Sequence, residues 1–210
     1  MTPAPLPIDV TALRTLDYVE VRDPKDMDTT SRVSLRFRDD SSLFSYRLQD
    51  RGLLRTSFDE PIAIIAERRL GSMLIALCSS QFATQIDIEG DGINSFCFHM
   101  VLQGTAKLVR SKNEGVIAGT DGAVFDGSPG TKILTSDISA RKSLWIEAGA
   151  LEHALEGMLG ESLRERLEFG PAIDWSSGLA ASLRSQIDFL ARDMTRPDGV
   201  ADNPVALACV

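Results

Sequence analysis

The fold is decided by residues 96–160, which read FCFHMVLQGTAKLVRSKNEGVIAGTDGAVFDGSPGTKILTSDISARKSLWIEAGALEHALEGMLG. The start of this stretch alternates between an apolar set and a mixed set of side chains: Phe96, Phe98, Met100 and Leu102 alternate with Cys97, His99, Val101 and Gln103. Because neighbouring side chains of a strand point to opposite faces, we predict a strand with one apolar and one mixed face. A barrel wall with a partly polar interior has this pattern, and the mouth of such a barrel is a common small-molecule site.

Turn signals and a later change of period predict the rest of the architecture. Glycine-containing turns at residues 89–92, 111–115, 119–122 and 126–130 have the spacing of an antiparallel sandwich or barrel. After the strand at residues 143–147, apolar residues recur at helical spacing up to Gly160 and again over residues 177–195. We therefore expect a mainly β fold with C-terminal helices: a flexible tail over residues 1–20, a barrel over 21–148 that includes a short helix near 24–37, and a helical segment over 149–210.

Composition excludes several classes of protein. The chain has 210 residues, 43% of them hydrophobic, and a formal net charge of -8. Nucleic-acid binding rests on clustered Lys and Arg, so the chain is not expected to grip DNA by itself. No apolar run approaches the roughly 20 residues that cross a bilayer, and the N-terminus lacks the pattern of a secretion signal, which predicts a cytoplasmic protein without a membrane partner. Cys78, Cys97 and Cys209 are too far apart for a CxxC motif and are expected to be reduced thiols.

The mixed faces of two strands supply the candidate ligand-binding residues. Gln103 shares the mixed face of the first strand with His99, and Arg141, Ser143 and Trp145 form the mixed face of the last strand. If both faces point inward, these groups could orient a small polar or aromatic ligand by hydrogen bonds, stacking and charge. The alternatives are that His99 is a core histidine bonded to a carbonyl, that Arg141 lies in solvent, and that Trp145 packs under the helix.

Catalytic and metal chemistry find little support in the sequence. A cupin metal site needs several imidazoles and a carboxylate, but this chain has only His99 and His153, on different predicted elements. No GxSxG elbow is present, and no cysteine has the context of an activated thiolate. We expect no catalytic residues, no metal and no cofactor.

The second predicted helix carries a narrow apolar stripe, composed of Leu183, Ile187, Leu190 and Met194. The stripe has two interpretations. It packs the helix against its own barrel or the preceding helix, or it meets its copy in a second subunit as an antiparallel dimerisation contact.

Three segments together resemble a known family. FHMVLQGTAKLV, VIAGTDGAVFDGSPG and the run from SLWIEAG to DFLARDM are similar, in order and spacing, to the cupin-type N-terminal domain of AraC-family transcriptional regulators over about residues 20–210. The resemblance implies a cupin-like jelly-roll barrel that binds a small-molecule effector, a homodimer, and a bacterial regulator whose helix-turn-helix DNA-binding domain is absent from this chain. By the same resemblance Gln103, Arg141, Ser143 and Trp145 would face the ligand.

The sequence thus predicts an effector-sensing and dimerisation domain, not an enzyme, that reports its occupancy to a C-terminal DNA-binding domain. The alternatives are a small cupin enzyme, such as an isomerase or dioxygenase, and an interaction module whose barrel is filled by its own side chains.

Overall fold

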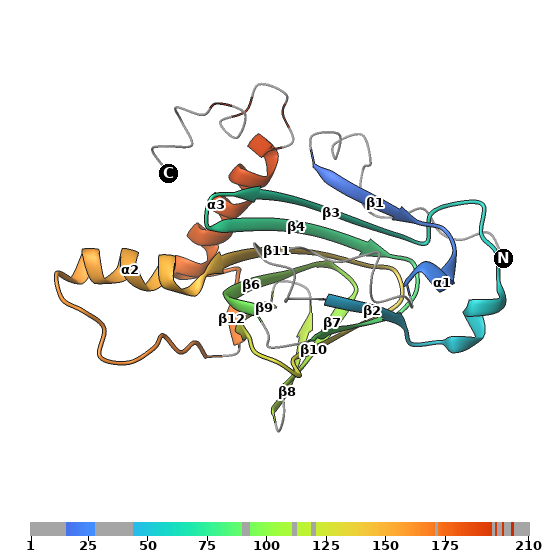
Figure 1. The fold of residues 1–210 in the computed structure, drawn as a ribbon, viewed down its shortest axis with the longest axis horizontal. Helices are drawn as coiled ribbons and strands as arrows, with labels where there is room; N and C mark the ends of the chain where they lie inside the picture. The colour runs from blue at the N-terminus through green and yellow to red at the C-terminus, as the bar shows by residue number, and fades with distance from the viewer. Residues whose placement is uncertain are drawn as a thin grey trace.

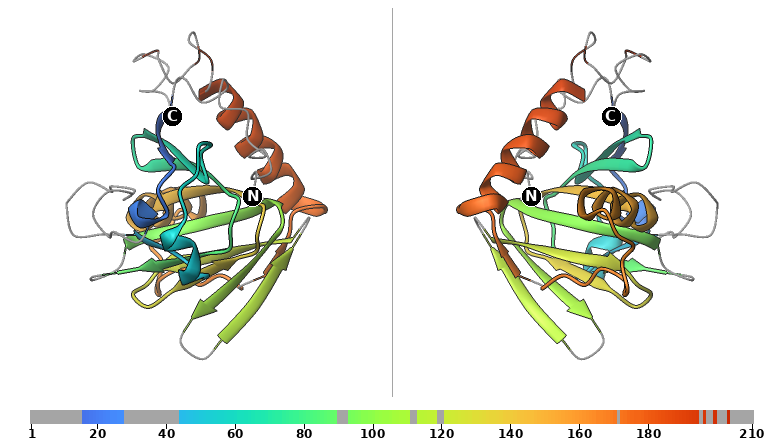
Figure 2. Two further views of the ribbon diagram at one scale, coloured as in Figure 1. Left: turned by 90° about the vertical axis from the view of Figure 1, so that its right-hand side faces the viewer. Right: turned by 90° about the vertical axis from the view of Figure 1, so that its left-hand side faces the viewer.

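A computed structural model describes residues 16–27, 44–89, 93–110, 113–118, 121–170 and 172–194, together with residues 196, 199 and 203. Its strands form two antiparallel sheets that face each other (Figures 1 and 2). The larger sheet has the order β1 (Asp17–Val21), β3 (Ala63–Leu70), β4 (Met73–Ser80), β11 (Ser139–Glu147), β6 (Ile93–Gln103), β9 (Asp121–Gly127) and β12 (Ala172–Asp174). The smaller sheet has the order β2 (Phe44–Leu48), β5 (Thr84–Ile88), β10 (Lys132–Thr135), β7 (Thr105–Arg110) and β8 (Asn113–Ala118).

The predicted fold class is confirmed: the chain is mainly β, with helices toward its C-terminal end. The described strands of the two sheets are not hydrogen-bonded into one closed ring, so the expected barrel is a two-sheet sandwich. Double-sheet jelly rolls have this arrangement.

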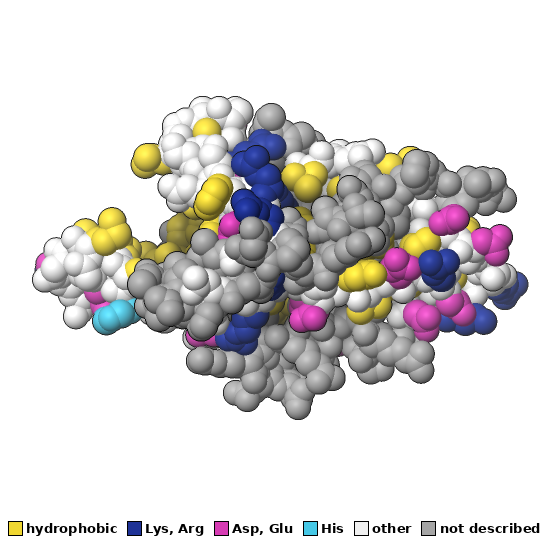
Figure 3. Space-filling model, turned by 90° about the horizontal axis from the view of Figure 1, so that it is seen from above, with side chains coloured by type: hydrophobic (Ala, Val, Ile, Leu, Met, Phe, Trp, Pro, Cys, Tyr) yellow, Lys and Arg dark blue, Asp and Glu magenta, His cyan; other side chains and the backbone are white. Residues whose placement is uncertain are grey.

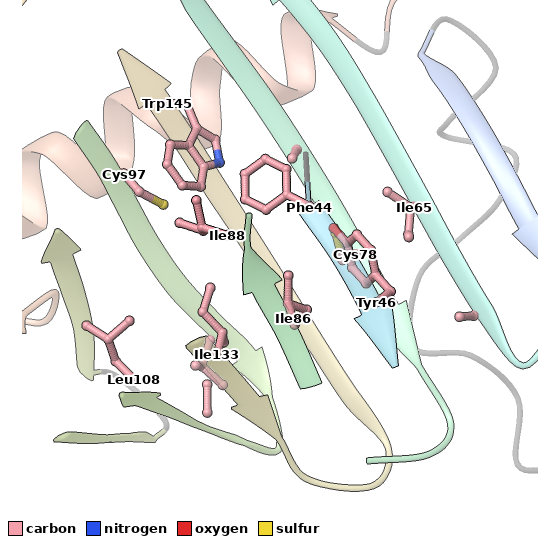
Figure 4. Packing of buried hydrophobic residues seen from close by; sticks show 14 of the residues in the cluster. Phe44, Tyr46, Ile65, Cys78, Ile86, Ile88, Cys97, Leu108, Ile133 and Trp145 are labelled. Atoms are coloured by element: carbon pink, nitrogen blue, oxygen red, sulfur yellow. The ribbon is translucent and has the colours of Figure 1, made fainter. Parts of the chain in front are cut away.

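Side-chain alternation divides the apolar residues into two clusters. The inner core lies between the sheets and takes residues from both, among them Phe44, Tyr46, Ile86, Cys97 and Trp145 (Figure 4). The outer core lies on the opposite face of the larger sheet, and Phe96, Phe98 and Met100 of β6 belong to it. Because its side chains alternate as predicted for residues 96–101, β6 contributes residues to both cores.

Helices begin where the strand pattern ends. Helix α2 (Ala148–Leu159) follows β11 directly and ends at Gly160, whose left-handed φ of 72° suits glycine at a helix C-terminus. Its far end extends away from the sheets (Figure 1), and Met158 is 84% exposed. The sheets therefore cover only the start of this helix. Only Ala148 is buried, although Leu151 packs against the outer core.

Helix α3 (Gly178–Met194) covers the outer core, close to the range that its periodicity predicted. Trp175, just before the helix, is 2% exposed, and Ile187 is 1% exposed. Two short helices complete the description, α1 (Pro24–Met27) and the 3-10 helix η2 (Arg51–Arg55).

One prediction about the N-terminal region needs correction. Residues 17–20 were expected in a flexible tail, but they form most of β1, which pairs with β3 because Val19 and Val21 lie opposite Ile65 and Ala63. The helix expected near residues 24–37 is observed as α1, and residues 28–37 lie outside the described part of the chain. The rest of the predicted tail, residues 1–15, lies outside it as well.

Candidate functional site

His99 and Ser143 lie directly opposite each other on the adjacent strands β6 and β11. Both point between the sheets, because Cys97, Val101 and Trp145, two residues away along the same strands, belong to the inner core. The two atoms His99 Nδ1 and Ser143 Oγ are 3.0 Å apart and form a hydrogen bond. The histidine is thus bonded to a side chain of the neighbouring strand, not to a backbone carbonyl.

The second ring nitrogen of His99, Nε2, is buried and has no hydrogen-bond partner among the described residues. Burial, followed by the positive charge of Arg141, lowers the pKa of His99 to about 3. The imidazole is therefore neutral at pH 7. Most buried polar atoms in proteins are hydrogen-bonded, so an unpaired ring nitrogen marks a position where a further group can bind.

Arg141 lies beside this pair and also points into the inner core. It is only 7% exposed, and its guanidinium carbon lies 5.8 Å from the centre of the Tyr46 ring. Burial, followed by the neighbouring Cys78, raises the pKa of Tyr46, so its hydroxyl stays protonated. The alternative that Arg141 lies in solvent is therefore wrong.

Trp145 packs inward and not under a helix. Its ring meets Phe44 at a centroid distance of 5.3 Å and Phe125 at 5.8 Å, both with edge-to-face geometry. Figure 4 shows Phe44 of β2 beside Trp145, with Tyr46 further along the same strand near Cys78. Aromatic residues of the smaller sheet thus cover the polar groups of the larger one.

Gln103 does not join the other four candidate residues. It is exposed, and so is the preceding Leu102, because the pairing of β6 with β11 shifts register between Ala140 and Arg141. A β-bulge adds a residue to one strand and breaks the alternation of its side chains. The sequence pattern therefore held only as far as Val101, and this correction removes Gln103 from the interior.

Beside Arg141, the described residues enclose only a small space. A cavity of about 10 Å³ is lined by Arg141, Tyr46 and Cys78 together with Met27, Ala63, Ile65, Ser79, Ser80 and Thr84. A volume of about 10–15 Å³ on this scale accommodates a single water molecule. In this structure, Phe44, Tyr46 and Trp145 fill the part of the interior that the described residues enclose.

Sequence reasoning missed Tyr46 and Glu67. Tyr46 belongs to FSYRL, where Phe44, Tyr46 and Leu48 alternate with Ser45 and Arg47, a strand signal that could have been read. For Glu67 no pattern in the sequence indicated burial, because it follows a continuous apolar run in which polar and apolar residues do not alternate. The buried Glu67 Oε2 has no hydrogen-bond partner among the described residues, and burial, followed by Asp17, raises its pKa to about 7.

The outer faces of β6 and β11 hold the segment that contains α3. Trp175 Nε1 donates a hydrogen bond to the backbone carbonyl of His99 at 3.2 Å. Lys142, next to Arg141 on β11, forms an ion pair with Asp188 of α3 at 2.5 Å. A Cβ atom at Gly122 would lie 1.6 Å from Trp175 Nε1, so only glycine fits under this indole.

The apolar stripe of α3 is occupied within the chain. Ile187 belongs to the outer core, and Leu183 and Leu190 pack against it, as the first interpretation of the stripe expected. The side chain of Met194 lies outside the described part of the structure. The exposed side of α3 carries Leu179 and Phe189, which are 90% and 60% exposed.

The described residues include no group of three or more His, Cys, Asp or Glu side chains that could hold a metal ion. His153, the second histidine, lies on α2 with a side chain that is 90% exposed. No helix within the described ranges is long and apolar enough to span a membrane.

Comparison with protein families gives one match. The sequence model of the AraC-binding-like domain family matches residues 55–210, about three quarters of the chain. Among curated proteins, no match is found.

Comparison with solved structures shows the same type of fold. The AraC-like transcriptional activator CuxR superposes with a TM-score of 0.55 and 14% identity, over 79% of this chain and 58% of that one. A ToxT variant from Vibrio cholerae has a TM-score of 0.42 and 16% identity over 65% of this chain and 52% of that one. A sugar phosphate isomerase of the cupin superfamily from Silicibacter pomeroyi has a TM-score of 0.35 and 15% identity over 40% of this chain and 59% of that one. The chain thus spans a little over half the length of these structures.

Proposed function

The chain belongs to the family of AraC-binding-like domains, and we propose that it is the effector-sensing domain of an AraC-type transcriptional regulator. It binds a small molecule between its two sheets, forms a homodimer, and passes the state of the site to a C-terminal DNA-binding domain. His99, Ser143, Arg141 and Trp145 orient the ligand. The proposal requires no catalysis.

One observation carries this proposal: β6 and β11 hold polar groups on one face and the α3 segment on the other. His99 and Arg141 point into the inner core from the same two strands. The carbonyl of His99 holds Trp175, and Lys142, next to Arg141, holds Asp188. A shift of either strand on ligand binding therefore moves an anchor of α3 directly.

The mechanism is a population shift between two positions of α3 relative to the larger sheet. An effector that binds the chain more tightly when α3 is in one of these positions shifts the equilibrium toward that position. The size of the shift is set by the ratio of the effector's affinities for the two conformers. Because α3 lies close to the C-terminal end of the chain, its position sets how an attached DNA-binding domain is presented. The net charge of -8 suits a domain that leaves DNA contacts to another part of the protein.

Ligand binding is tested by a thermal-shift screen of the purified chain against sugars, aromatic acids and amines. A ligand present at 100 times its Kd stabilises the folded state by about 2.7 kcal/mol, which for a chain of this size raises Tm by roughly 5–10 °C. We expect the shift to be lost in Ser143→Val and kept in Ser185→Ala, whose hydroxyl lies on the exposed side of α3. A shift that persists in Ser143→Val would place the ligand elsewhere.

Transmission is tested with the ligand found in that screen. We expect the ligand to change hydrogen exchange in the amides of α3, and Asp188→Asn to reduce this change while the affinity stays within about threefold. Asp188→Asn removes the ion pair with Lys142 but keeps a side chain of the same shape. An unchanged exchange response in Asp188→Asn would show that this contact does not couple the site to α3.

A second function is favoured by the cavity of about 10 Å³ beside Arg141 and Tyr46. A sandwich filled by its own side chains would serve assembly alone. The thermal-shift screen separates the two functions, because such a module gains no stability from any of the small molecules.

A further inference from the structure

We propose that the effector is a monoanion, a small carboxylate with an apolar body, whose carboxylate pairs with the buried guanidinium of Arg141. This inference rests on the proposed function and names the chemistry of the ligand. Its starting point is that Arg141 is 93% removed from solvent but lacks a carboxylate partner among the described residues, since no ion pair within 4.0 Å includes it.

A buried charge without a partner is unfavourable for the ligand-free protein. Transfer of an ion from water to a protein interior costs several kcal/mol unless an opposite charge or hydrogen bonds compensate. Arginine keeps its charge at all physiological pH values, so it cannot relieve this cost by losing a proton. A carboxylate that binds beside it supplies the missing charge and accepts two parallel N–H bonds from the planar guanidinium.

Arg141 has polar neighbours, but none of those described is a carboxylate. Burial lowers the pKa of Arg141, but its interactions with Cys78 and Tyr46 outweigh this effect and raise the pKa. Tyr46 contributes its ring face at 5.8 Å, and burial, followed by Cys78, raises the pKa of its hydroxyl. Burial also raises the pKa of the Cys97 thiol, and burial, with Arg141, lowers the pKa of His99, so both side chains are neutral at pH 7. The described side chains around the guanidinium, Cys78 included, thus offer hydroxyl, thiol and imidazole groups but no carboxylate.

His99 provides a second polar contact. Its Nε2 is buried and unpaired, while Nδ1 is engaged with Ser143 Oγ. In the tautomer in which Nδ1 accepts a hydrogen bond from the Ser143 hydroxyl, the ring proton is on Nε2. This N–H group can then donate a hydrogen bond to an anionic oxygen. A carboxylate bound to Arg141 would thus have a second donor in His99 Nε2, because the guanidinium lies close enough to His99 to lower its pKa together with burial.

Charge and lining select the kind of anion. One guanidinium balances one negative charge, whereas a phosphate monoester carries about -1.5 to -2 at pH 7 and would leave an excess charge buried. The same small cavity has a mixed lining, with the apolar side chains of Met27, Ala63 and Ile65 on one hand and Ser79, Ser80 and Thr84 on the other, which suits a small ligand with an apolar body and a polar group. A monocarboxylate fits both conditions.

Room for the ligand comes from the side of Tyr46. The cavity of about 10 Å³ holds no more than a water molecule, so a ligand has to displace side chains. Tyr46 lies on β2, an edge strand that is paired only with β5 among the described strands. Its hydroxyl contacts Cys78 Sγ at 3.9 Å and also interacts with Arg141. A shift of β2 that moves Tyr46 away from Arg141 would uncover the guanidinium for a carboxylate that takes the place of the hydroxyl.

The test compares each acid with its own amide. Isobutyrate, cyclohexanecarboxylate and phenylacetate, with their carboxamides, are titrated into the purified chain at pH 7.5 and followed by thermal shift and calorimetry. We expect at least one carboxylate to bind at least tenfold more tightly than its amide. This comparison needs no variant, so it does not depend on how well a mutant folds.

Variants then locate the charge. Arg141→Met should abolish carboxylate binding, because it removes the positive charge and the planar pair of N–H donors while methionine keeps an apolar side chain in the inner core. Arg69→Met is the matched control, since Arg69 on β3 is paired with Glu147 at 2.7 Å, and it should keep carboxylate binding. Equal binding of carboxylates by Arg141→Met overturns the proposal.

The outcomes separate this inference from the proposed function. If sugars, amines or the amides bind between the sheets and the carboxylates do not, the effector-sensing function stands and the anionic ligand is wrong. If the carboxylates bind with loss in Arg141→Met, both stand. If no compound of either series or of the wider screen binds, the sensing function is contradicted as well.

Discussion

At the scale of single residues, His99 makes the fold sensitive to acid. The pKa of His99 is about 3 in the folded chain and about 6.5 in an unfolded one, so between these values the unfolded state binds more protons. The free energy of unfolding therefore falls as the pH falls, by up to about 1.4 kcal/mol per pH unit. His99→Gln should flatten this dependence between pH 6 and pH 4 in urea unfolding. The prediction fails if the variant loses stability in parallel with the wild type.

Glu67 has the opposite dependence. Burial and the neighbouring Asp17 raise its pKa to about 7 in the folded chain, above the ordinary value of about 4.3 for an unfolded chain. Between these values the folded state binds more protons, so this group stabilises the fold at low pH and the stability is lost as the pH rises through 7. Because Glu67 is partly exposed, we expect a loss of about 1–2 kcal/mol by pH 8.

Glu67→Gln tests this dependence. The variant should be more stable than the wild type at pH 8 and similar to it at pH 5, as measured by urea unfolding at both values. Glu147→Gln, which removes the partner of Arg69 at the surface, is the control and should show no such gain at pH 8. A Glu67→Gln chain that is less stable at pH 8 would show that the carboxylate has a stabilising partner there.

At the scale of elements, the sequence predicted β6 and β11 better than the strands that cover them. Both strands are covered on two faces, one more polar than the other, so their side chains alternate clearly over residues 96–101 and 141–146. This alternation correctly placed four side chains on the face toward the inner core: His99, Arg141, Ser143 and Trp145. It failed for Gln103, since a bulge depends on pairing with β11 and leaves no local pattern. Tyr46 reaches Arg141 only through packing of the smaller sheet, a contact across nearly 100 residues that periodicity does not encode.

The contact of β9 with the start of α3 gives a second prediction. Gly122→Ala places a Cβ atom 1.6 Å from Trp175 Nε1 and 2.5 Å from the His99 carbonyl, so the indole has to leave its site. We expect a loss of at least about 3 kcal/mol in urea unfolding and a red shift of tryptophan fluorescence. Gly149→Ala on α2, with open space around its Cβ, is the control and should be neutral or slightly stabilising. An unshifted spectrum in Gly122→Ala would contradict the packing of Trp175.

Helix α3 offers a third prediction, which separates its two sides. Ile187→Ala should cost about 2–4 kcal/mol of folding stability, because Ile187 is buried in the outer core of its own chain. Leu179→Ala, at a position that is 90% exposed, should change stability by less than about 0.5 kcal/mol. Urea unfolding at several protein concentrations measures both. A small effect of Ile187→Ala would mean that α3 is not held by the larger sheet.

At the scale of the whole molecule, the larger sheet separates the proposed ligand-binding residues from the segment that contains α3. The inner face holds Arg141 and His99, and the outer face holds Trp175 and Asp188 through the same two strands. A domain built in this way needs no long pathway between its ligand and its output. The proposed homodimer also requires a surface through which two copies of the domain meet.

The homodimer gives the last prediction. Because Leu183, Ile187 and Leu190 pack within the chain, an intermolecular contact through α3 has to use its other side, where Phe189 and Leu179 are exposed. Large apolar side chains are also exposed at the far end of α2 (Figure 3), including Met158, and they provide a matched control. We expect light scattering of the wild-type chain to report a dimer.

Phe189→Ser should raise the Kd of that dimer about tenfold or more, since aromatic side chains at the centre of an interface carry much of its binding energy. Met158→Ser should leave the dimer intact, and neither change should alter the stability of the folded chain by more than about 0.5 kcal/mol. If Met158→Ser dissociates the dimer and Phe189→Ser does not, the contact runs through α2. A wild-type chain that stays monomeric at high concentration would show that this domain does not supply the dimer contact by itself.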